Sequence, residues 1–165
     1  PTRVLEPLDL NEVVVEAAQL MGGEPEASCI ELDRHDEPLP VEADREELRR
    51  VYINLLKNAM QAIPDEQAGH VRVVTAAGEH DEGMPQACSW VIDDGTGIPP
   101  DVQDKIFEPN FSTKTSGTGL GLAIAKKSLD ELGGTIDYET AEGEGTTFEL
   151  RLPLVDDQVD RDRSF

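Results

Sequence analysis

The sequence predicts an α+β fold, a two-layer sandwich in which three helices cover a mixed sheet. Two helical periodicities lie in the first 63 residues, strand-like alternation follows them, and a third helix precedes a final hairpin. With 165 residues, the chain is long enough for one domain with a hydrophobic core. Because only 4% of the residues are aromatic, we expect a core built mainly of Leu, Val, Ile and Ala.

The charge balance excludes several classes of partner. The chain carries 35 acidic and 14 basic residues, a net charge of -21. Nucleic acids need a basic face, and an anionic membrane would repel this chain, so we expect neither partner for the domain. We interpret the surplus acid as solvated surface, and any bound phosphate must be held by local groups because the overall field repels it.

Three segments have helical periodicity, and two of them begin at a capping box. Asp9 with Glu12 opens the first helix, which runs to residue 21, and Asp44 with Glu47 opens the second, which runs to residue 63. The third helix, 120–132, ends at two glycines.

Alternating patterns predict strands at 28–33, 71–76, 87–93, 135–139 and 146–152, with 39–42 as the hairpin partner of the first. Cys29 and Cys88 fall in these strands, and we expect buried, reduced thiols. Residues 94–118 show no sustained periodicity apart from a short turn at 102–107, which is typical of a functional lid.

The expected domain therefore spans 9–154. Residues 1–8 form an extended lead-in from an upstream helical domain, and 155–165 form an acidic tail. The chain begins with Pro1 rather than Met, so we expect it to be part of a longer protein.

Two asparagines lie in the middle of the second predicted helix. Asn54 and Asn58 are four residues apart, so both amides project from one face. Asparagine is a poor helix former, which makes two of them in a strong helix notable. An amide oxygen is a hard ligand suited to Mg²⁺, so we assign Asn58 as the metal ligand and Asn54 to phosphate or metal-bound water. Two buried asparagines that satisfy backbone groups are the alternative.

Asp93 ends a strand pattern and enters a turn that contains Gly95 and Gly97. A carboxylate there can accept a hydrogen bond from an exocyclic amine such as that of adenine, while the glycines let the backbone approach the ring. Ile98 would add an apolar wall. Asp93 and Asp94 together also suit a hard cation, and a plain Asp-Gly turn is the alternative without a ligand.

Alternating glycines stand at the start of the third predicted helix. Free N–H groups and the helix dipole bind anions at such a position. The spacing fits neither the Walker pattern nor the dinucleotide fingerprint, and a glycine-rich hinge is the alternative. Thr113 and Lys114 come just before and can add a hydroxyl and a charge near a γ-phosphate. The phosphate-binding residues expected here are Gly117, Thr118, Gly119, Leu120 and Gly121.

A fourth motif, Gly143-Glu144-Gly145-Thr146, would close the floor of the same pocket, with Thr146 among its contacts. The four motifs in this order describe a complete ATP pocket. Phe107 and Phe111 fall in the presumed lid, where they either anchor the loop to the core or dock a partner. Anchoring is the simpler interpretation.

These motifs resemble the catalytic and ATP-binding domain of two-component sensor histidine kinases, in the gyrase, Hsp90, histidine kinase and MutL superfamily. The N box is 54–59, the F box is 107–114, and the three glycine boxes are 93–97, 117–122 and 143–148. The resemblance extends from about Leu8 to Pro153. It implies a Bergerat-type sandwich that binds Mg-ATP under a flexible lid at about 98–118 and transfers phosphate to a histidine on a separate helical domain.

The resemblance also implies roles and partners. Asn54 and Lys114 would be catalytic, with ATP and Mg²⁺ as cofactors. The partners would be the dimerisation and phosphoacceptor domain of the same parent protein and a downstream response regulator. The domain would be cytoplasmic, in a parent that can itself be membrane-anchored. The sequence departs from the family at Gln61 and Ala62, where many members carry a basic and an aromatic nucleotide contact; this leaves Lys114 as the main cation near the phosphates.

Residue 54 favours phosphoryl transfer over hydrolysis. The resemblance implies that hydrolases of the superfamily, such as gyrase and Hsp90, carry at this helix position a glutamate that polarises a water molecule. Asn54 cannot take a proton from water. It can still position phosphate for a stronger nucleophile such as imidazole. His35, His70 and His80 lie in no His-Glu/Asp-x-x-x-Pro pattern, and we expect all three at the surface. An anti-sigma-factor-type serine kinase and an ATP-gated binding module of the same fold are the alternatives.

Overall fold

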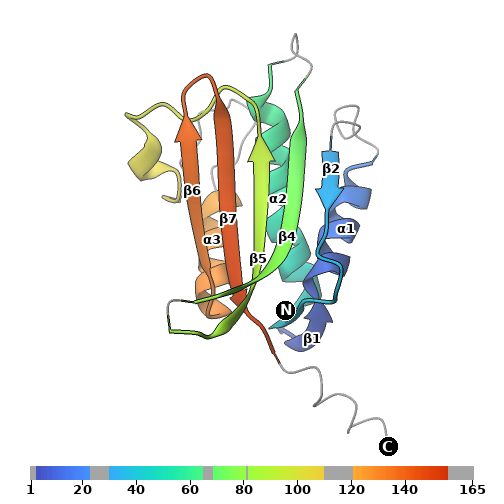
Figure 1. Cartoon of the computed structure of the whole chain (residues 1–165). Helices are drawn as coiled ribbons and strands as arrows, with labels where there is room; N and C mark the ends of the chain where they lie inside the picture. The colour runs from blue at the N-terminus through green and yellow to red at the C-terminus, as the bar shows by residue number, and fades with distance from the viewer. Residues whose placement is uncertain (1–2, 23–29, 65–68, 81, 110–120, 156–165) are drawn as a thin grey trace, which may run out of the picture.

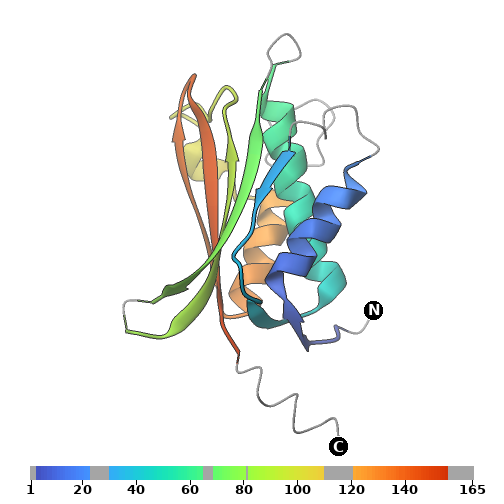
Figure 2. The ribbon, with the colours of Figure 1, turned by 45° about the vertical axis from the view of Figure 1, so that its right-hand side comes forward.

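The computed structural model describes residues 3–22, 30–64, 69–80, 82–109 and 121–155. Within these residues, a five-stranded mixed sheet and three helices form two layers (Figure 1). Figure 2 shows that the helices all lie on one face of the sheet. The α+β sandwich predicted from the sequence is confirmed.

The helices are α1 (Leu10–Leu20), α2 (Arg45–Ala62) and α3 (Gly121–Glu131), and a 3₁₀ turn, η2, covers Gln103–Lys105. The main sheet has the order β2-β4-β5-β7-β6, with β2 (Ile30–Asp33), β4 (Val71–Glu79), β5 (Pro85–Asp93), β6 (Thr135–Ala141) and β7 (Gly145–Pro153). A second, two-stranded sheet joins β1 (Glu6–Asp9) to β3 (Pro40–Ala43). Among the described helices, none combines the length and the apolar character that a membrane span requires.

Two aspartates define where α1 and α2 begin. Asp9 Oδ1 accepts a hydrogen bond from Asn11 N at 3.0 Å, and Asp44 Oδ1 accepts one from Glu47 N at 3.0 Å. Each bond satisfies a donor that the first helical turn leaves without an intrahelical acceptor. Both predicted helix starts are confirmed.

The central hairpin is longer than its sequence pattern predicts. β4 and β5 pair antiparallel from Val71 opposite Asp93 to Glu79 opposite Pro85. The end of this ladder contains Gly78 and small or polar neighbours, which carry little apolar alternation, so the pattern stopped short of the true strand ends. β2 pairs parallel to β4 while the other neighbours pair antiparallel, which makes the sheet mixed as predicted.

The pairing predicted for residues 39–42 is wrong. Instead of forming a hairpin with β2, β3 pairs antiparallel with β1. The Leu39 N–H donates to the Asp9 carboxylate at 2.9 Å, and the Asn11 amide donates to two carbonyls of the 35–37 segment, both at 3.1 Å. These bonds hold the segment at the start of α1, so β2 pairs with β4 instead.

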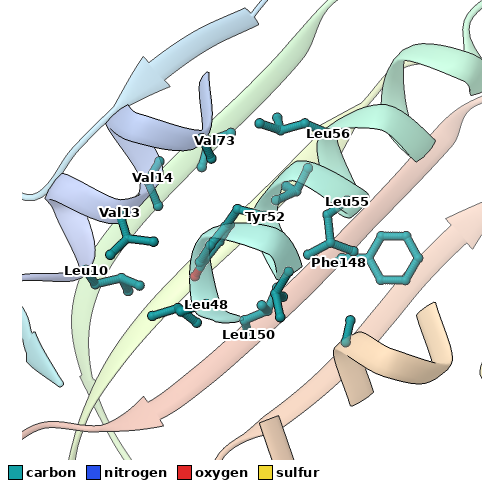
Figure 3. Packing of buried hydrophobic residues seen from close by; sticks show 14 of the residues in the cluster. Leu10, Val13, Val14, Leu48, Tyr52, Leu55, Leu56, Val73, Phe148 and Leu150 are labelled. Carbon is teal, nitrogen blue, oxygen red and sulfur yellow. The ribbon is translucent and has the colours of Figure 1, made fainter. Parts of the chain in front are cut away.

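Tyr52 of α2 lies at the centre of the core against the sheet (Figure 3). Its side chain is fully buried, and its hydroxyl lies 2.6 Å from Ser89 Oγ on β5. Burial raises the pKa of Tyr52 because the phenolate would lose its hydration. Cys88 is a buried free thiol, as predicted, and Cys29 lies outside the described residues. The surrounding core is mainly aliphatic, as expected, and includes Leu10, Leu48, Leu55, Leu56 and Leu150.

The segment before β1 is tied to the helical layer. The Arg3 guanidinium binds both carboxylate oxygens of Glu47, at 2.6 and 2.7 Å, and lies 3.0 Å from Glu131 of α3. The Val4 N–H donates to Asp44 at 2.9 Å. Hydrogen bonding to Glu47 holds the pKa of Arg3 above its ordinary value, and the N–H of Val4 holds the pKa of Asp44 below its own.

Candidate functional site

The helix-facing side of the sheet changes from apolar to polar at one end. Residues directly opposite one another on β5, β7 and β6 form rows across the three strands. Asp93 and Thr146 are 7% and 5% exposed. The register thus sets the carboxylate of Asp93 beside the hydroxyls of Thr146 and Thr140, at the end of an apolar face. The last two rows are Val91, Phe148 and Tyr138, followed by Asp93, Thr146 and Thr140.

The two asparagines lie on α2, whose last residue, Ala62, accepts a hydrogen bond from the turn after Asp93. Asn54 and Asn58 are both half-buried and lie one helical turn apart. The start of α3 lies beside the first of them, since a Cβ built on Gly121 would be 3.6 Å from Asn54 Cγ. The fold therefore brings Asn54 next to Gly121, the last residue of the predicted phosphate-binding segment, although the two residues are 67 positions apart in the chain.

The turn after Asp93 is held between α2 and the turn that joins β6 to β7. The Thr96 N–H donates to the Ala62 carbonyl at 3.0 Å, and the Thr96 carbonyl accepts from Gly143 N–H at 2.7 Å. A Cβ on Gly95 would overlap the Ala62 carbonyl oxygen. The turn can therefore reach α2 only because residue 95 has no side chain.

Gly97 and Gly145 allow two more close approaches of backbone. Their φ angles are +74° and +114°, in the region that favours glycine. A Cβ on Gly97 would overlap the Ala141 carbonyl oxygen, and one on Gly145 would overlap that of Asp93. These glycines thus have a packing function that fixes the position of Asp93, whether or not they also contact a ligand.

The neighbouring aspartates bind different groups. Asp93 Oδ1 accepts from Gly95 N at 2.9 Å, whereas the exposed Asp94 accepts from His70 N at 2.8 Å. The bond from the His70 backbone N–H directs the Asp94 carboxylate to the start of β4. This arrangement does not support a cation site shared by Asp93 and Asp94, which was one interpretation of the sequence. Over the described ranges, no group of three or more His, Cys, Asp or Glu side chains is arranged to hold a metal ion.

Residues 98–109 are anchored to β6. The Ile98 N–H donates to Thr140 Oγ1 at 2.9 Å, and the Ile98 carbonyl accepts from the Gln103 amide at 2.9 Å. The Tyr138 hydroxyl donates to the Gln103 carbonyl at 2.9 Å. Ile98 is half-buried against the core, and its backbone lies beside Thr140 of the polar row. Its role as an apolar wall for a ligand stays a prediction.

Phe107 completes this anchor. Its ring lies 5.9 Å from the ring of Tyr138 and 6.5 Å from that of Phe148, measured between centroids. Lys126 Nζ of α3 lies 5.8 Å from the centre of the Phe107 ring, within the range of a cation–π contact. The anchoring role predicted for Phe107 is confirmed, and Phe111 lies outside the described residues.

Much of the predicted phosphate-binding segment also lies outside the described residues. Its assignments stay predictions. They concern Thr113, Lys114, Gly117, Thr118, Gly119 and Leu120.

Sequence reasoning missed Thr140, Tyr138 and Gln103, which hold the site together. A usable signal was present for the first two. Alternation along 135–141 places residues 136, 138 and 140 on one face, so a threonine that ends an apolar series indicates a polar end of that face.

The histidines and the departures from the family pattern can now be placed. His70 and His80 are exposed, as predicted, but His35 is half-buried. The backbone N–H of His35 donates to Thr75 Oγ1 at 2.8 Å. Gln61, where many family members carry a nucleotide contact, is exposed.

A separate depression of about 250 Å³ lies at the opposite end of the sheet, beside Leu152 and the end of α3, and contains no predicted site residue.

Comparison with known proteins agrees with this architecture. A profile of the family described as "Histidine kinase-, DNA gyrase B-, and HSP90-like ATPase" matches residues 43–156. The chain belongs to this ATPase family. Among its relatives in the family, the sensor histidine kinase ZraS of Escherichia coli K12 is 38% identical over 93% of the chain, and the sensor kinase CckA of Brucella abortus is 36% identical over 90%. The chain spans 32% and 17% of these two proteins, respectively.

Solved structures of the family match the fold over nearly the whole chain. The catalytic domain of the histidine kinase ThkA is 33% identical, with a TM-score of 0.76 over 92% of this chain and 96% of that one. The mycobacterial sensor histidine kinase MprB is 30% identical, with a TM-score of 0.76 over 92% and 98%. The chain thus corresponds to the ATP-binding catalytic domain of sensor histidine kinases.

Proposed function

We propose that this domain binds Mg-ATP and transfers the γ-phosphoryl group to a histidine on a separate helical dimerisation domain of its parent protein. A response regulator would then receive the phosphate. The proposed domain spans 9–154, with a lid at about 98–118, and it works in the cytoplasm, where ATP is supplied. No membrane or nucleic acid is involved in the step.

The position of Asn54 carries the proposal. The side chain lies beside Gly121 at the start of α3, where the helix dipole favours the negative charge of phosphate. An amide can hydrogen-bond phosphate oxygens or metal-bound water, but it cannot act as the general base that hydrolysis by water requires. A stronger nucleophile needs mainly positioning, so this geometry favours transfer to an imidazole.

The residues of the site fit the nucleotide. Asp93 and Thr146 lie opposite one another on β5 and β7 and offer oxygen acceptors for an exocyclic amine. Asn58 would supply one oxygen ligand to Mg²⁺, whose other ligands would be phosphate oxygens and water. Lys114 would add the positive charge that stabilises the transferred group. A relative that shares this fold, full-length ShkA, was solved in complex with AMPPNP, at 30% identity and a TM-score of 0.73 over 94% of this chain.

Binding can be tested by calorimetry with Mg-ATP. Replacement of Asn58 by Ala or Asp should weaken Mg-ATP binding by roughly tenfold or more, because a metal ligand is lost or its charge changed. Arg50→Ala is the matched control, since Arg50 is an exposed residue of the same helix and two turns away from the metal ligand. Equal affinities of all variants would overturn the metal assignment.

Transfer can be tested by adding the helical dimerisation domain of the parent protein with labelled ATP. We expect acid-labile phosphohistidine on the added domain, and its loss in Asn58→Ala. The chain alone should bind ATP without incorporating phosphate. Acid-stable phosphoserine on a partner would favour the serine-kinase alternative, and binding without any transfer would favour the ATP-gated binding module. The relatives, all sensor kinases in the comparisons above, favour the histidine acceptor.

A further inference from the structure

Thr140 uses its hydroxyl group completely. A threonine hydroxyl has one proton to donate and two lone pairs to accept with. Thr140 Oγ1 donates to the Gly145 carbonyl at 3.1 Å and accepts from the Ile98 N–H at 2.9 Å. One lone pair remains, and Thr146 Oγ1 lies 2.9 Å away.

The donor in the contact between the two threonines follows from these partners. A carbonyl cannot donate and an N–H cannot accept, so neither Gly145 nor Ile98 can exchange its role. All three contacts are satisfied together only when the Thr146 hydroxyl donates to Thr140. The single proton of Thr146 then points across to the Thr140 oxygen on β6, and the lone pairs of the Thr146 oxygen are left for other donors.

We infer that Thr140 is a positioning residue that sets base specificity by turning Thr146 into a hydrogen-bond acceptor toward the bound base. The inference rests on the proposed nucleotide site. Asp93 lies directly opposite Thr146 across β5 and β7, and its carboxylate is also an acceptor. Side chains opposed in this way have Cβ atoms about 4.5–5.5 Å apart, so both can face one ligand group.

Two acceptors side by side select the chemistry of the ligand edge. An exocyclic amino group has two N–H donors and can satisfy both. A keto oxygen at the same ring position would face these two acceptors and offer neither of them a proton, which is costly in a site as buried as this one. Thr140 therefore contributes to the choice of a 6-amino purine over a 6-keto purine without contacting the base.

The test compares ATP with ITP, whose base has a keto group at position 6. Dissociation constants are measured by calorimetry for the wild-type chain, Thr140→Val and Thr140→Ser. In Thr140→Val the Thr146 proton is released and can turn toward the ligand, so the ratio of the ITP to the ATP dissociation constant should fall roughly tenfold. Thr140→Ser keeps the hydroxyl and should restore the wild-type ratio.

A structural role for Thr140 would give a different result. Loss of packing or of the Ile98 contact would weaken ATP and ITP binding alike and leave their ratio unchanged, which would overturn the inference. A second arm uses Thr146→Val, which removes the group that Thr140 orients. In that background, Thr140→Val should not change the ratio further. A further fall would show that Thr140 does not act through Thr146.

The inference and the proposed function fail in different ways. If the wild-type chain does not bind Mg-ATP, the proposed function is wrong. If it binds ATP and Thr140→Val keeps the wild-type ratio, only the inference is wrong. Should Thr140→Val lose the folded circular dichroism spectrum, NMR of the wild-type complex decides: the Thr146 hydroxyl proton should show contacts to the Thr140 methyl group, and contacts to the base instead would overturn the inference.

Discussion

Gly145 lies directly against Asp93, so close that a Cβ on the glycine would overlap the Asp93 carbonyl oxygen. The two residues belong to motifs about fifty positions apart, and β5 and β7 pair beside them. The glycine motif at 143–146 thus sets the backbone position of Asp93, whose carboxylate lies at the end of the polar row. The motif that we expected to close the floor of the ATP pocket therefore also allows β5 and β7 to pair closely at this end of the sheet.

Gly145→Ala should therefore be far more damaging than Gly143→Ala. Both residues have positive φ, +114° and +81°, but a Cβ on Gly143 would meet open space. We expect a loss of about 1 kcal/mol for Gly143→Ala from the left-handed conformation, and roughly 3 kcal/mol or more for Gly145→Ala from conformation and overlap together. Urea unfolding measures both, and similar losses would contradict the close contact.

Phe107→Ala should loosen the segment 98–109. The half-buried ring packs against Tyr138 and Phe148, and its removal should lower the free energy of unfolding by about 2 kcal/mol. Hydrogen exchange of the amides near Gln103 should become faster at the same time. Glu108→Ala is the control, since that side chain is exposed. Unchanged exchange in Phe107→Ala would mean that the hydrogen bonds alone anchor the segment.

Tyr52 and Ser89 should be strongly coupled in a double-mutant cycle. Their hydroxyls lie 2.6 Å apart in the core, so each single variant, Tyr52→Phe or Ser89→Ala, leaves a buried hydroxyl without its partner. We expect each to cost about 1–3 kcal/mol and the double variant to cost clearly less than the sum. Additive losses in thermal or urea unfolding would show that the pair contributes no mutual stabilisation.

Asp44 should make stability depend on pH in the acid range. Its pKa lies below the ordinary value because Val4 N–H and Glu47 N–H donate to the carboxylate. A lowered folded-state pKa means that the stabilisation is fully present above about pH 4 and is lost as pH falls through the folded pKa.

Asp44→Ala should therefore lower the free energy of unfolding by about 1 kcal/mol at pH 7, and this difference from wild type should shrink toward pH 2. Glu46→Ala, an exposed residue in the same helical turn, is the control. A difference that stays constant from pH 7 to pH 2 would show that the charge on Asp44 makes no contribution.

The parts of the fold that depend on local chemistry were predictable. Asp9 and Asp44 start helices through bonds to residues two or three positions away, and a glycine with positive φ follows α3. The N box is equally local, because two asparagines four residues apart share a helix face whatever the rest of the chain does.

Other features depended on contacts between distant segments. β3 was assigned to the wrong partner because nothing within 39–42 shows that Asp9 and Asn11 bind the preceding loop. The alternation along 135–141 marks Thr140 as the polar end of a strand face, but its partners depend on distant contacts: Ile98 lies 42 positions earlier, and the β6–β7 register sets Thr140 beside Thr146.

The order of the motifs alone identifies the family and the helix that carries Asn54 and Asn58, since both follow from residue type and short spacing. The row of Asp93, Thr146 and Thr140 exists only in the folded sheet, because register is a property of paired strands and not of any one of them. The direction of the Thr146 proton follows from that register, through a chain of hydrogen bonds whose members are far apart in sequence and adjacent in space.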